Sequence, residues 1–267
     1  MTTLIAAERL ARIKEILLQE GSVKTAELAD RFRVSHETIR RDLTLLEQDG
    51  VIQKAYGGAI LDAKLKEAME AIVPVRRRKL QRFAEKDAIG LAAAALVQDG
   101  QIVVLDAGST TWCVARHLKR LHHLTIITNS VDVVQECAQN GDLSLFVLGG
   151  KLNARSMCMV GPQVETELKR YHADVVFVGA VGVSLHKGLT SSDLYEAEVK
   201  RAMVEAGQKK VVVADHTKLQ QQGLVSFAAL ADMDILITDD QADAAIVRQL
   251  ERAGIQVIVC APEPVSA

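Results

Sequence analysis

The sequence predicts an α/β protein of two domains, a small helical domain at the N-terminus and a larger domain built on a mostly parallel sheet. In the first 60 residues, apolar residues recur at helical spacing in short segments, and a glycine pair follows a short apolar run. From about Glu85 onward, helical segments alternate with short apolar strands. Of 267 residues, 49% are hydrophobic, so both domains can own a core. We therefore expect domains at residues 1–60 and 83–267, joined by a basic linker at 61–82.

The N-terminal domain is predicted to contain three short helices. The first spans roughly Ala7 to Gln19 and is ended by Gly21. Thr25 is expected to cap the second helix, and Ser35 is expected to cap the third after a short turn. Two helices joined by so few residues are typical of a helix-turn-helix.

The third helix is predicted to have one buried and one exposed face. At 100° per residue, Leu43 and Leu46 fall within about 40° of Ile39 and form one apolar stripe. The other face carries side chains suited to base edges and phosphates, so it is the expected DNA-reading face. Together with the caps, the residues predicted to contact DNA in these helices are Thr25, Ser35, His36, Glu37, Thr38, Arg40, Arg41 and Thr44.

A β-hairpin is predicted after the third helix. Val51 and Ile52 resume apolar character, and Gly57-Gly58 permits a tight turn. In a winged helix-turn-helix this hairpin is the wing, which lies near the DNA backbone or the adjacent minor groove. The wing residues predicted to contact DNA are Lys54, Tyr56, Gly57 and Gly58.

The charge of the chain is distributed unevenly. The formal net charge of −2 divides into 0 for residues 1–60, +4 for 61–82 and −6 for 83–267. The DNA-binding prediction therefore rests on arginines clustered near the third helix and not on a basic domain. The run Arg76-Arg77-Arg78-Lys79 has two interpretations: it contacts phosphates, or it is a solvated linker or a surface that pairs with the acidic domain.

The larger domain is predicted to be a Rossmann-like α/β domain. Continuous apolar strands that alternate with helices are buried on both faces, as in a parallel sheet. The predicted strands are Ile102 to Leu105, Leu124 to Thr128, Leu143 to Leu148, Val175 to Val178, Val211 to Ala214, Ile235 to Thr238 and Ile255 to Val259.

A candidate anion site follows the first of these strands. In the run from Asp106 to Thr111, Gly108 lets the backbone approach a ligand, and Ser109, Thr110 and Thr111 supply hydroxyls at the start of a helix. Free backbone N–H groups there favour an anion such as phosphate. The alternative is that Asp106 and Ser109 only cap a βα turn.

Other strand ends add candidate ligand contacts, because open α/β sheets bind ligands beyond the carboxyl ends of their strands. These contacts are Thr128, Asn129, Ser130, Gly149, Gly150, Glu196, Asp215 and Lys218. Each has a plainer interpretation as a helix cap, a turn or a surface residue. For Glu196, that interpretation is an exposed i,i+4 ion pair with Lys200.

The sequence predicts no metal site, no cofactor and no disulfide. The histidines lack carboxylate or cysteine partners at ligand spacing. The four cysteines, at positions 113, 137, 158 and 260, form no C-x-x-C pair and fit the reduced thiols of a cytoplasmic protein. No apolar stretch reaches the length of about 20 residues that a membrane span needs.

The runs TAELADRF, VSHETIRRDL and LEQDGVIQKAYGGA, with the later DAGSTT and TNS, resemble the DeoR family of bacterial transcriptional regulators. The resemblance implies a regulator that binds double-stranded operator DNA, in most cases as a repressor. It also implies an effector domain similar to ribose-5-phosphate isomerase that senses phosphorylated sugars or related metabolites. A dimer or larger assembly is expected, because operators are commonly palindromic or repeated.

The alternative function is a sugar-phosphate isomerase with an accessory DNA-binding domain. The isomerase relatives carry acidic residues in the glycine turn after a central strand, which corresponds here to residues 179–183. That turn contains no carboxylate, and Val181 stands where many regulators of the family have Asp. Because isomerisation needs a placed general base and acid, we expect no enzyme activity.

Overall fold

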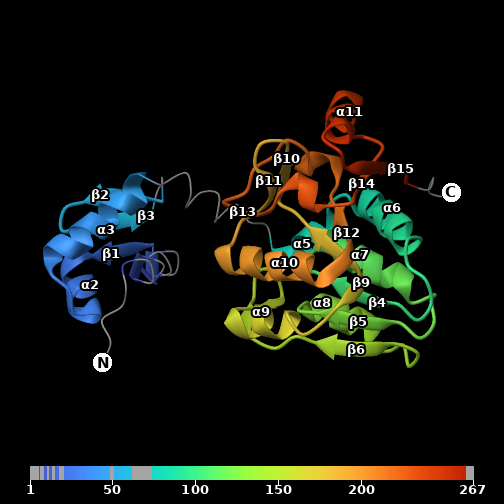
Figure 1. Ribbon diagram of the computed structural model, residues 1–267, viewed down its shortest axis with the longest axis horizontal. Coiled ribbons are helices and arrows are strands. Elements are labelled where there is room, and N and C mark those ends of the chain that lie inside the picture. Colours follow the sequence, from blue (N-terminus) through green and yellow to red (C-terminus); the bar gives the residue numbers. More distant parts are fainter. Residues whose placement is uncertain are drawn as a thin grey trace. The chain divides into compact units, whose positions relative to one another are not determined.

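The computed structural model describes residues 6, 9, 10, 12, 13, 16, 17, 21–48, 51–61 and 74–262. The chain forms two compact units, Met1–Ile72 and Val73–Ala267 (Figure 1). Each unit has its own buried apolar cluster.

The N-terminal unit contains the predicted helix-turn-helix. The described residues between positions 6 and 17 are helical, and the rest of the predicted first helix lies outside the described residues. The N–H of Gly21, at a φ of 75°, donates to Leu17 O at 2.8 Å and ends this segment. The helices α2 (Thr25–Phe32) and α3 (His36–Gln48) follow, separated by a turn in which Arg33 is left-handed.

The predicted cap of α2 is wrong. The N-cap residue is Lys24, which makes no side-chain cap hydrogen bond, and Thr25 is the first helical residue. The reason is a strand that the sequence pattern did not indicate, β1 (Ser22–Lys24), which runs directly into the helix. Thr25 is buried as a result, and its N–H donates to Gly57 O at 2.9 Å.

The predicted wing is part of a three-stranded sheet. β2 (Ile52–Ala55) and β3 (Gly58–Leu61) are antiparallel, and β1 pairs with the other edge of β3. The turn consists of Tyr56 and Gly57, not of the two glycines, because Gly58 already pairs with Ala55. Gly57 supplies the left-handed φ of 78° that this two-residue turn needs.

The basic run predicted as a linker is helical. β3 extends to Leu61, residues 62–73 lie outside the described residues, and α5 (Val75–Leu80) contains the basic run. Val75 is buried, and its N–H donates to Arg155 O at 3.0 Å. Lys79 pairs with Asp132 at 2.8 Å, so α5 packs on the acidic domain as part of the second unit.

The seven predicted strands form one parallel sheet, in the order β15-β14-β12-β9-β4-β5-β6. Each predicted strand is confirmed, with small differences at the ends. In chain order the strands are β4 (Ile102–Leu105), β5 (Thr125–Thr128), β6 (Ser144–Val147), β9 (Ala173–Gly179), β12 (Gly207–Val213), β14 (Ile235–Asp239) and β15 (Gln256–Cys260).

Helices cover both faces of this sheet, which is why its central strands are apolar throughout. On one face of the sheet, here called the first face, a buried apolar cluster contains the helix residues Ile89, Val114 and Val133. On the opposite, second face, another buried apolar cluster contains the helix residues Met203 and Leu250. The helices of the first face are α6 (Phe83–Ala94), α7 (Ser109–Leu118) and α8 (Val131–Cys137). Those of the second are α9 (Pro162–Leu168), α10 (Leu194–Ala206) and α11 (Ala244–Arg252).

Two smaller sheets were not evident in the sequence. β7 (Lys151–Asn153) pairs with β8 (Cys158–Val160), and β11 lies between β10 and β13. The remaining elements are β10 (Gly182–Ser184), β11 (Gly188–Ser191), η1 (His216–Lys218), β13 (Val225–Ala228) and η2 (Leu230–Asp232).

The strand order reverses between β4 and β9. From β4 the chain proceeds through β5 to β6, whereas from β9 it proceeds through β12 and β14 to β15 in the opposite direction (Figure 1). In open α/β sheets, the crevice at such a switch point lies beyond the carboxyl ends of the strands. The segments that follow β4 and β9 are therefore the first place to look for a ligand site.

A Cβ at Gly58 would lie 2.0 Å from Val23 O in the neighbouring strand. Gly58→Ala should therefore destabilise the N-terminal unit by about 1–3 kcal/mol, because the backbone must shift to make room for the added methyl group. Hydrogen exchange across β1 and thermal unfolding of the full chain measure the loss. Gly57→Asn is the matched control, since a Cβ at Gly57 meets nothing within 4 Å and Asn tolerates a left-handed φ. Wild-type protection of β1 in Gly58→Ala would contradict the prediction.

Candidate functional site

The N-terminus of α3 is held by a side-chain cap. Ser35 Oγ accepts from the N–H of Thr38 at 3.1 Å, which confirms the predicted cap. The predicted apolar stripe is also confirmed, because Ile39, Leu43 and Leu46 are all buried. The opposite face of α3 is thereby directed away from the core.

The exposed face of α3 carries most of the helix residues predicted to contact DNA. His36, Glu37, Arg40 and Arg41 are exposed, and Thr38 is half-buried. Arg40 Nη1 lies 3.8 Å from Glu37 Oε2, whereas Arg41 has no ion-pair or hydrogen-bond partner among the described residues. A free guanidinium on an exposed helix face can make a bidentate contact with a guanine or a phosphate.

Two other predicted contacts have partners for their side chains within the domain. The Thr44 hydroxyl donates to Arg40 O at 2.8 Å, as is common for Thr inside a helix. Lys54 pairs with Glu47 at 2.9 Å, and both side chains are about two-fifths exposed. Tyr56 is fully exposed at the turn of the wing, whereas Thr25 is buried.

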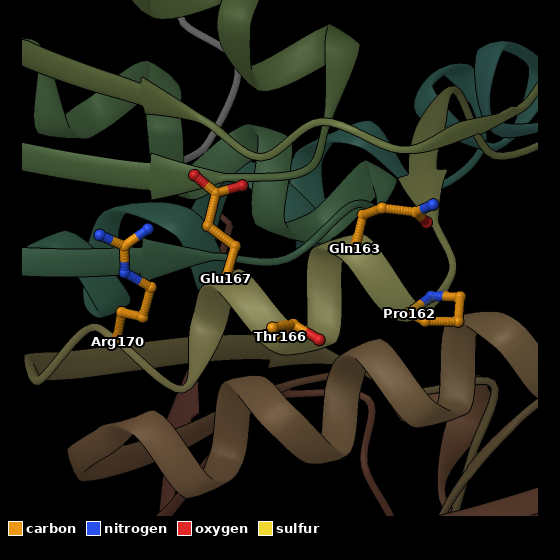
Figure 2. A pocket seen from close by; sticks show the side chains of 5 residues that line it. All are labelled: Pro162, Gln163, Thr166, Glu167 and Arg170. Atoms are coloured by element: carbon orange, nitrogen blue, oxygen red, sulfur yellow. The ribbon is translucent and has the colours of Figure 1, made fainter.

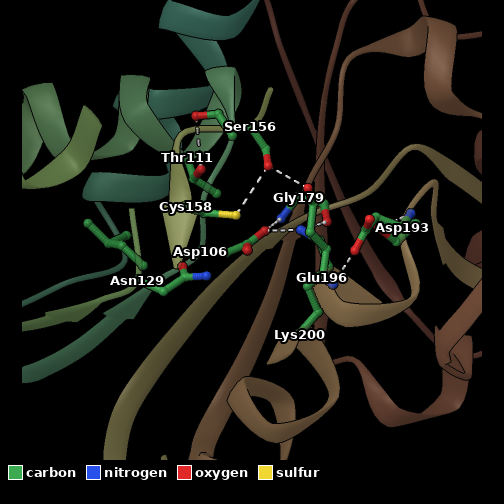
Figure 3. A network of polar contacts seen from close by, with 12 residues as sticks. Asp106, Thr111, Asn129, Ser156, Cys158, Gly179, Asp193, Glu196 and Lys200 are labelled. Carbon is green, nitrogen blue, oxygen red and sulfur yellow. Dashed lines mark hydrogen bonds and ion pairs between the residues drawn. The ribbon is translucent and has the colours of Figure 1, made fainter. Parts of the chain in front are cut away.

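A buried polar network lies at the switch point of the large sheet. The Asp106 carboxylate, just after β4, pairs with Lys200 Nζ of α10 and accepts from the Gly179 N–H at 2.9 Å. Lys200 also donates to Gly179 O at 3.0 Å. Asp106 is 2% exposed and Lys200 is 5% exposed, so the two charges neutralise each other inside the protein (Figure 3).

The structure contradicts the exposed Glu196–Lys200 ion pair. Lys200 is buried and its carboxylate partner is Asp106, which is 94 positions away in the sequence. The reason is tertiary: α10 packs against β9, so Lys200 reaches the end of β4. Helical spacing alone could not reveal this partner.

The Glu196 carboxylate belongs to the same network. It accepts from the Ser156 hydroxyl (Figure 3) and from Asn153 Nδ2 at 3.0 Å. Both donors come from the β7–β8 hairpin. Burial raises the pKa of Glu196 above its ordinary value. Asp193 caps α10 by accepting from the Glu196 N–H at 2.9 Å.

The predicted anion site at the start of α7 has no internal cap. The N-cap residue is Gly108, and no side chain accepts from the first turn. Asp106 is not a cap, since its carboxylate is held by Lys200 and Gly179. Ser109 is buried in the first turn, and the Thr111 hydroxyl donates to Gly108 O at 3.1 Å.

Asn129 follows the neighbouring strand β5 and is 2% exposed. Its Nδ2 donates to Met159 O at 2.8 Å, but its Oδ1 accepts from no described residue. Buried polar atoms are rarely left unsatisfied, so this amide oxygen requires a donor. Because Leu105 of β4 pairs with Thr128 of β5, Asp106 and Asn129 each directly follow a paired residue, so both lie at the same edge of the sheet.

The other predicted ligand contacts have local structural partners. The Thr128 hydroxyl donates to Leu105 O at 2.7 Å, and Ser130 caps α8 by accepting from the Val133 N–H. Asp215 caps η1 by accepting from Thr217. Gly150 packs against Val160. Among the described residues, neither Lys218 nor Gly149 is a hydrogen-bond or ion-pair partner of Asp106.

Helix α5 is held by elements that border this network. Lys79 pairs with Asp132 on α8 and lies 4.3 Å from the ring centre of Trp112 on α7. Lys86 on α6 donates to the carbonyl oxygens of Arg78, at 2.9 Å, and of Gln81. Burial lowers the pKa of Lys86, which also lies 3.9 Å from Asp215.

A separate surface hollow of about 430 Å³ lies over α9 and the turn that follows this helix. Figure 2 shows the five side chains that line it, Pro162, Gln163, Thr166, Glu167 and Arg170. None of them was a predicted contact. The described residues include no group of three or more His, Cys, Asp or Glu placed to hold a metal ion. None of the described helices is long and apolar enough to cross a membrane.

An exposed arginine-bearing helix in a helix-turn-helix, followed by an α/β domain with a buried polar site, defines the class of DNA-binding regulators that carry a ligand-sensing domain. Comparisons with known proteins agree. The family described as "DeoR C terminal sensor domain" matches residues 81–240, and the "DeoR-like helix-turn-helix domain" matches residues 9–64. The chain belongs to the DeoR family and is a DNA-binding transcriptional regulator.

Several curated proteins are similar along almost their whole length. The uncharacterized HTH-type transcriptional regulator YulB of Bacillus subtilis is 33% identical, over 95% of this chain and 96% of its own. The HTH-type transcriptional repressor GlcR of the same organism is 33% identical over 94% and 95%. The HTH-type transcriptional regulator GolR of Listeria innocua is 34% identical over 94% and 97%.

Among solved structures, ribose 5-phosphate isomerase A from Methanocaldococcus jannaschii matches 50% of this chain and 53% of its own. The two are 21% identical, with a TM-score of 0.37.

Glu196→Gln should gain stability relative to the wild type as the pH rises. A raised pKa in the folded state means that the protonated carboxyl stabilises the fold. This contribution is full below the ordinary carboxyl pKa of about 4.3 and is lost as the pH rises through the folded pKa. Gln cannot ionise, so the free energy of unfolding of the variant minus that of the wild type should increase across this window.

Chemical denaturation at several pH values measures that difference. Glu205→Gln, at an exposed position of the same helix, is the control for replacing a glutamate by glutamine in α10. A profile for Glu196→Gln that does not rise above that of Glu205→Gln would contradict the prediction.

Proposed function

We propose that this chain is a repressor of a carbohydrate or polyol catabolic operon, and that a phosphorylated sugar or related metabolite in the C-terminal domain relieves repression. Repression is supported by relatives whose names call them repressors, among them GlcR and a putative aga operon transcriptional repressor of Escherichia coli. The DNA partner is double-stranded operator DNA, read by the exposed face of α3 and flanked by the wing.

The observation that carries the effector proposal is the buried Asn129 Oδ1, which has no donor among the described residues and lies at the same sheet edge as the uncapped start of α7. The N–H groups of a helix start favour a phosphate, whose oxygens accept hydrogen bonds. The Asn129 oxygen needs the opposite kind of partner, a donor such as a sugar hydroxyl. A phosphorylated sugar or polyol carries both groups in one small molecule.

The Asp106–Lys200 pair and Glu196 supply further polar groups at the same edge. Because Lys200 neutralises Asp106, an incoming phosphate meets no uncompensated carboxylate there. Glu196, whose pKa is raised by burial, presents a carboxyl group that exchanges hydrogen bonds with hydroxyls. The effector contacts proposed from sequence at Asp106, Gly108 to Thr111, Asn129 and Glu196 belong to this site.

Coupling requires that the effector binds two conformations with different affinity. Helix α5, which follows the segment that joins the two units, contacts α7 through Trp112, α8 through Asp132 and the β7–β8 hairpin through Arg155. A ligand that shifts α7 or α8 therefore changes the contacts that hold α5. Trp112, which contacts Lys79 of α5, is a built-in fluorescence reporter of such a shift.

We infer that the chain has no isomerase activity. General acid–base chemistry needs a free, placed base, and residues 179–183 contain no carboxylate. Asp106 is occupied by Lys200 and Gly179. A coupled assay for aldose–ketose conversion should stay at background with each sugar phosphate that binds.

The same proposal includes a cytoplasmic location and a homodimer or larger assembly. One helix-turn-helix contacts only a short half-site, and two-fold related half-sites call for a two-fold related protein. Sedimentation with and without operator DNA measures the number of subunits.

The experiment that tests the function is a thermal-shift screen of phosphorylated sugars and polyols against the full chain, followed by operator binding with each compound that stabilises it. We expect at least one compound to raise the unfolding temperature and weaken operator binding. If compounds bind but none changes operator affinity, the coupling part of the proposal fails.

Arg41→Ala should weaken binding to the operator relative to random DNA by about 1–3 kcal/mol, the value of one bidentate base contact. Arg41 is exposed and has no partner among the described residues, so we expect its loss to leave the fold intact. Titration of labelled duplexes measures both affinities. Arg248→Ala, on α11 of the other unit, is the control for loss of one positive charge. If Arg41→Ala distinguishes operator from random DNA as well as the wild type does, Arg41 makes no specific base contact.

Ser109→Ala should leave operator binding unchanged and weaken the response to the effector found in the screen. The Ser109 hydroxyl lies in the first turn of α7, where it is expected to donate to the phosphate. The concentration of effector that gives half release from the operator measures the change. Ser144→Ala, at an exposed position of β6, is the matched control. A wild-type response of Ser109→Ala would move the phosphate site elsewhere.

A further inference from the structure

A buried ion pair joins the first helical segment to α3 in the N-terminal unit. Arg9 Nε lies 2.6 Å from Asp42 Oδ2, and Arg9 Nη2 lies 3.2 Å from Asp42 Oδ1. Arg9 is 8% exposed and Asp42 is 4% exposed. The pair thus forms a two-pronged contact between guanidinium and carboxylate inside a small domain, 33 positions apart in sequence.

Stability by itself gives no reason for this pair. Removing two charged groups from water has a large free-energy cost, and their mutual attraction often does not offset it. Replacement of a buried ion pair by well-packed apolar residues of similar size is therefore often neutral or stabilising. The surrounding core already buries Ile13, Leu17, Ile39 and Leu43. An apolar pair would fit that core better if burial were the only requirement.

The pair restricts the rotation of α3 about its own axis. The apolar stripe of α3 attracts the core without directional preference, so it tolerates small rotations of the helix about its axis. A guanidinium fork on a carboxylate has a fixed planar geometry, and it constrains the rotation at Asp42.

Small rotations matter for DNA reading. Side chains reach about 5–6 Å from a helix axis, so a rotation of about 20° displaces their ends by about 2 Å. That displacement breaks a hydrogen bond, whose length varies by only about 0.5 Å. Asp42 and Arg41 are sequence neighbours on one rigid helix, so the rotation that the pair sets at Asp42 is the rotation of Arg41.

We propose that Arg9 and Asp42 are a positioning pair, which sets the rotation of α3 and thereby the ability of its exposed face to distinguish one DNA sequence from another. This inference rests on the proposed role of α3 as the DNA-reading helix. Neither residue contacts DNA in this proposal. Both act through the side chains of α3 that do.

The test uses the full chain and a DNA duplex enriched by the wild-type protein from a random pool. The main variant is the double substitution Arg9→Met with Asp42→Leu, which removes both charges, keeps the net charge and fills the space with apolar groups. Hydrogen exchange across α2 and α3 measures whether the unit is folded. The ratio of Kd values for random and enriched duplexes measures discrimination.

We expect wild-type protection of α2 and α3 in the double variant, with discrimination reduced about 5- to 150-fold, which corresponds to one misplaced bidentate base contact. Affinity for random DNA should be unchanged, because the net charge is unchanged. Each single variant should lose protection, since it leaves one buried charge unpaired. A folded double variant with wild-type discrimination would show that the pair is merely structural and would overturn the proposal.

Arg9→Lys keeps the proposal testable if the double variant does not fold. Lysine retains the charge but not the planar fork, so we expect a folded unit with reduced discrimination. A folded Arg9→Lys chain that discriminates like the wild type would also overturn the proposal.

Two further variants separate the causes. Glu27→Gln removes an exposed ion pair with Lys24 in the same unit and should change neither protection nor discrimination. Arg41→Ala tests the reading face itself. If Arg41→Ala discriminates normally, the assignment of that face fails, whereas loss in Arg41→Ala with no loss in the double variant refutes only the positioning pair.

Discussion

The C-terminal domain depends on the buried contact between Asp106 and Lys200. This contact joins three segments, the end of β4, the end of β9 through Gly179, and α10. Because both charges are buried, loss of either partner leaves an uncompensated charge, at a cost of about 3–5 kcal/mol. The contact therefore holds the strand ends together at the point where the strand order reverses, and that edge is where an α/β sheet offers a ligand site.

The N-terminal domain contains a contact of the same kind. Arg9 and Asp42 are also buried and also far apart in sequence, and they join the first helical segment to α3, the proposed DNA-reading helix. In each domain, apolar packing supplies the stability and a buried ion pair restricts the geometry. Buried ion pairs are costly compared with apolar contacts, so their position beside both proposed sites is consistent with a role in positioning.

Much of the fold follows from short patterns in the sequence. The seven strands of the large sheet were predictable because each is a continuous apolar run, buried on both faces. The smaller strands were not. β1 consists of SVK with one buried residue, and β7 of KLN with none, so neither differs from a loop in composition. Their pairing partners lie across turns, and this is why Thr25 is not the helix cap that the sequence predicts.

For the candidate site, residue type and strand ends pointed to Asp106, Asn129 and Glu196, because polar residues directly after an apolar strand are visible in the sequence. The partners of these residues were not visible. The sequence pattern offers Lys200 only as an i,i+4 partner of Glu196, and Ser156 and Asn153 carry no pattern of their own.

The sequence by itself therefore determined the domain order, the parallel sheet, the apolar stripe of α3 and the residues that stand at the strand ends. Local periodicity and composition are enough for these features, because each depends on neighbours within one helix or strand. Only the tertiary structure decided which charges meet, which hydroxyls are already used in caps and which buried oxygen has no donor among the described residues. Those outcomes depend on packing between segments tens of residues apart, for which a single sequence contains no distance information.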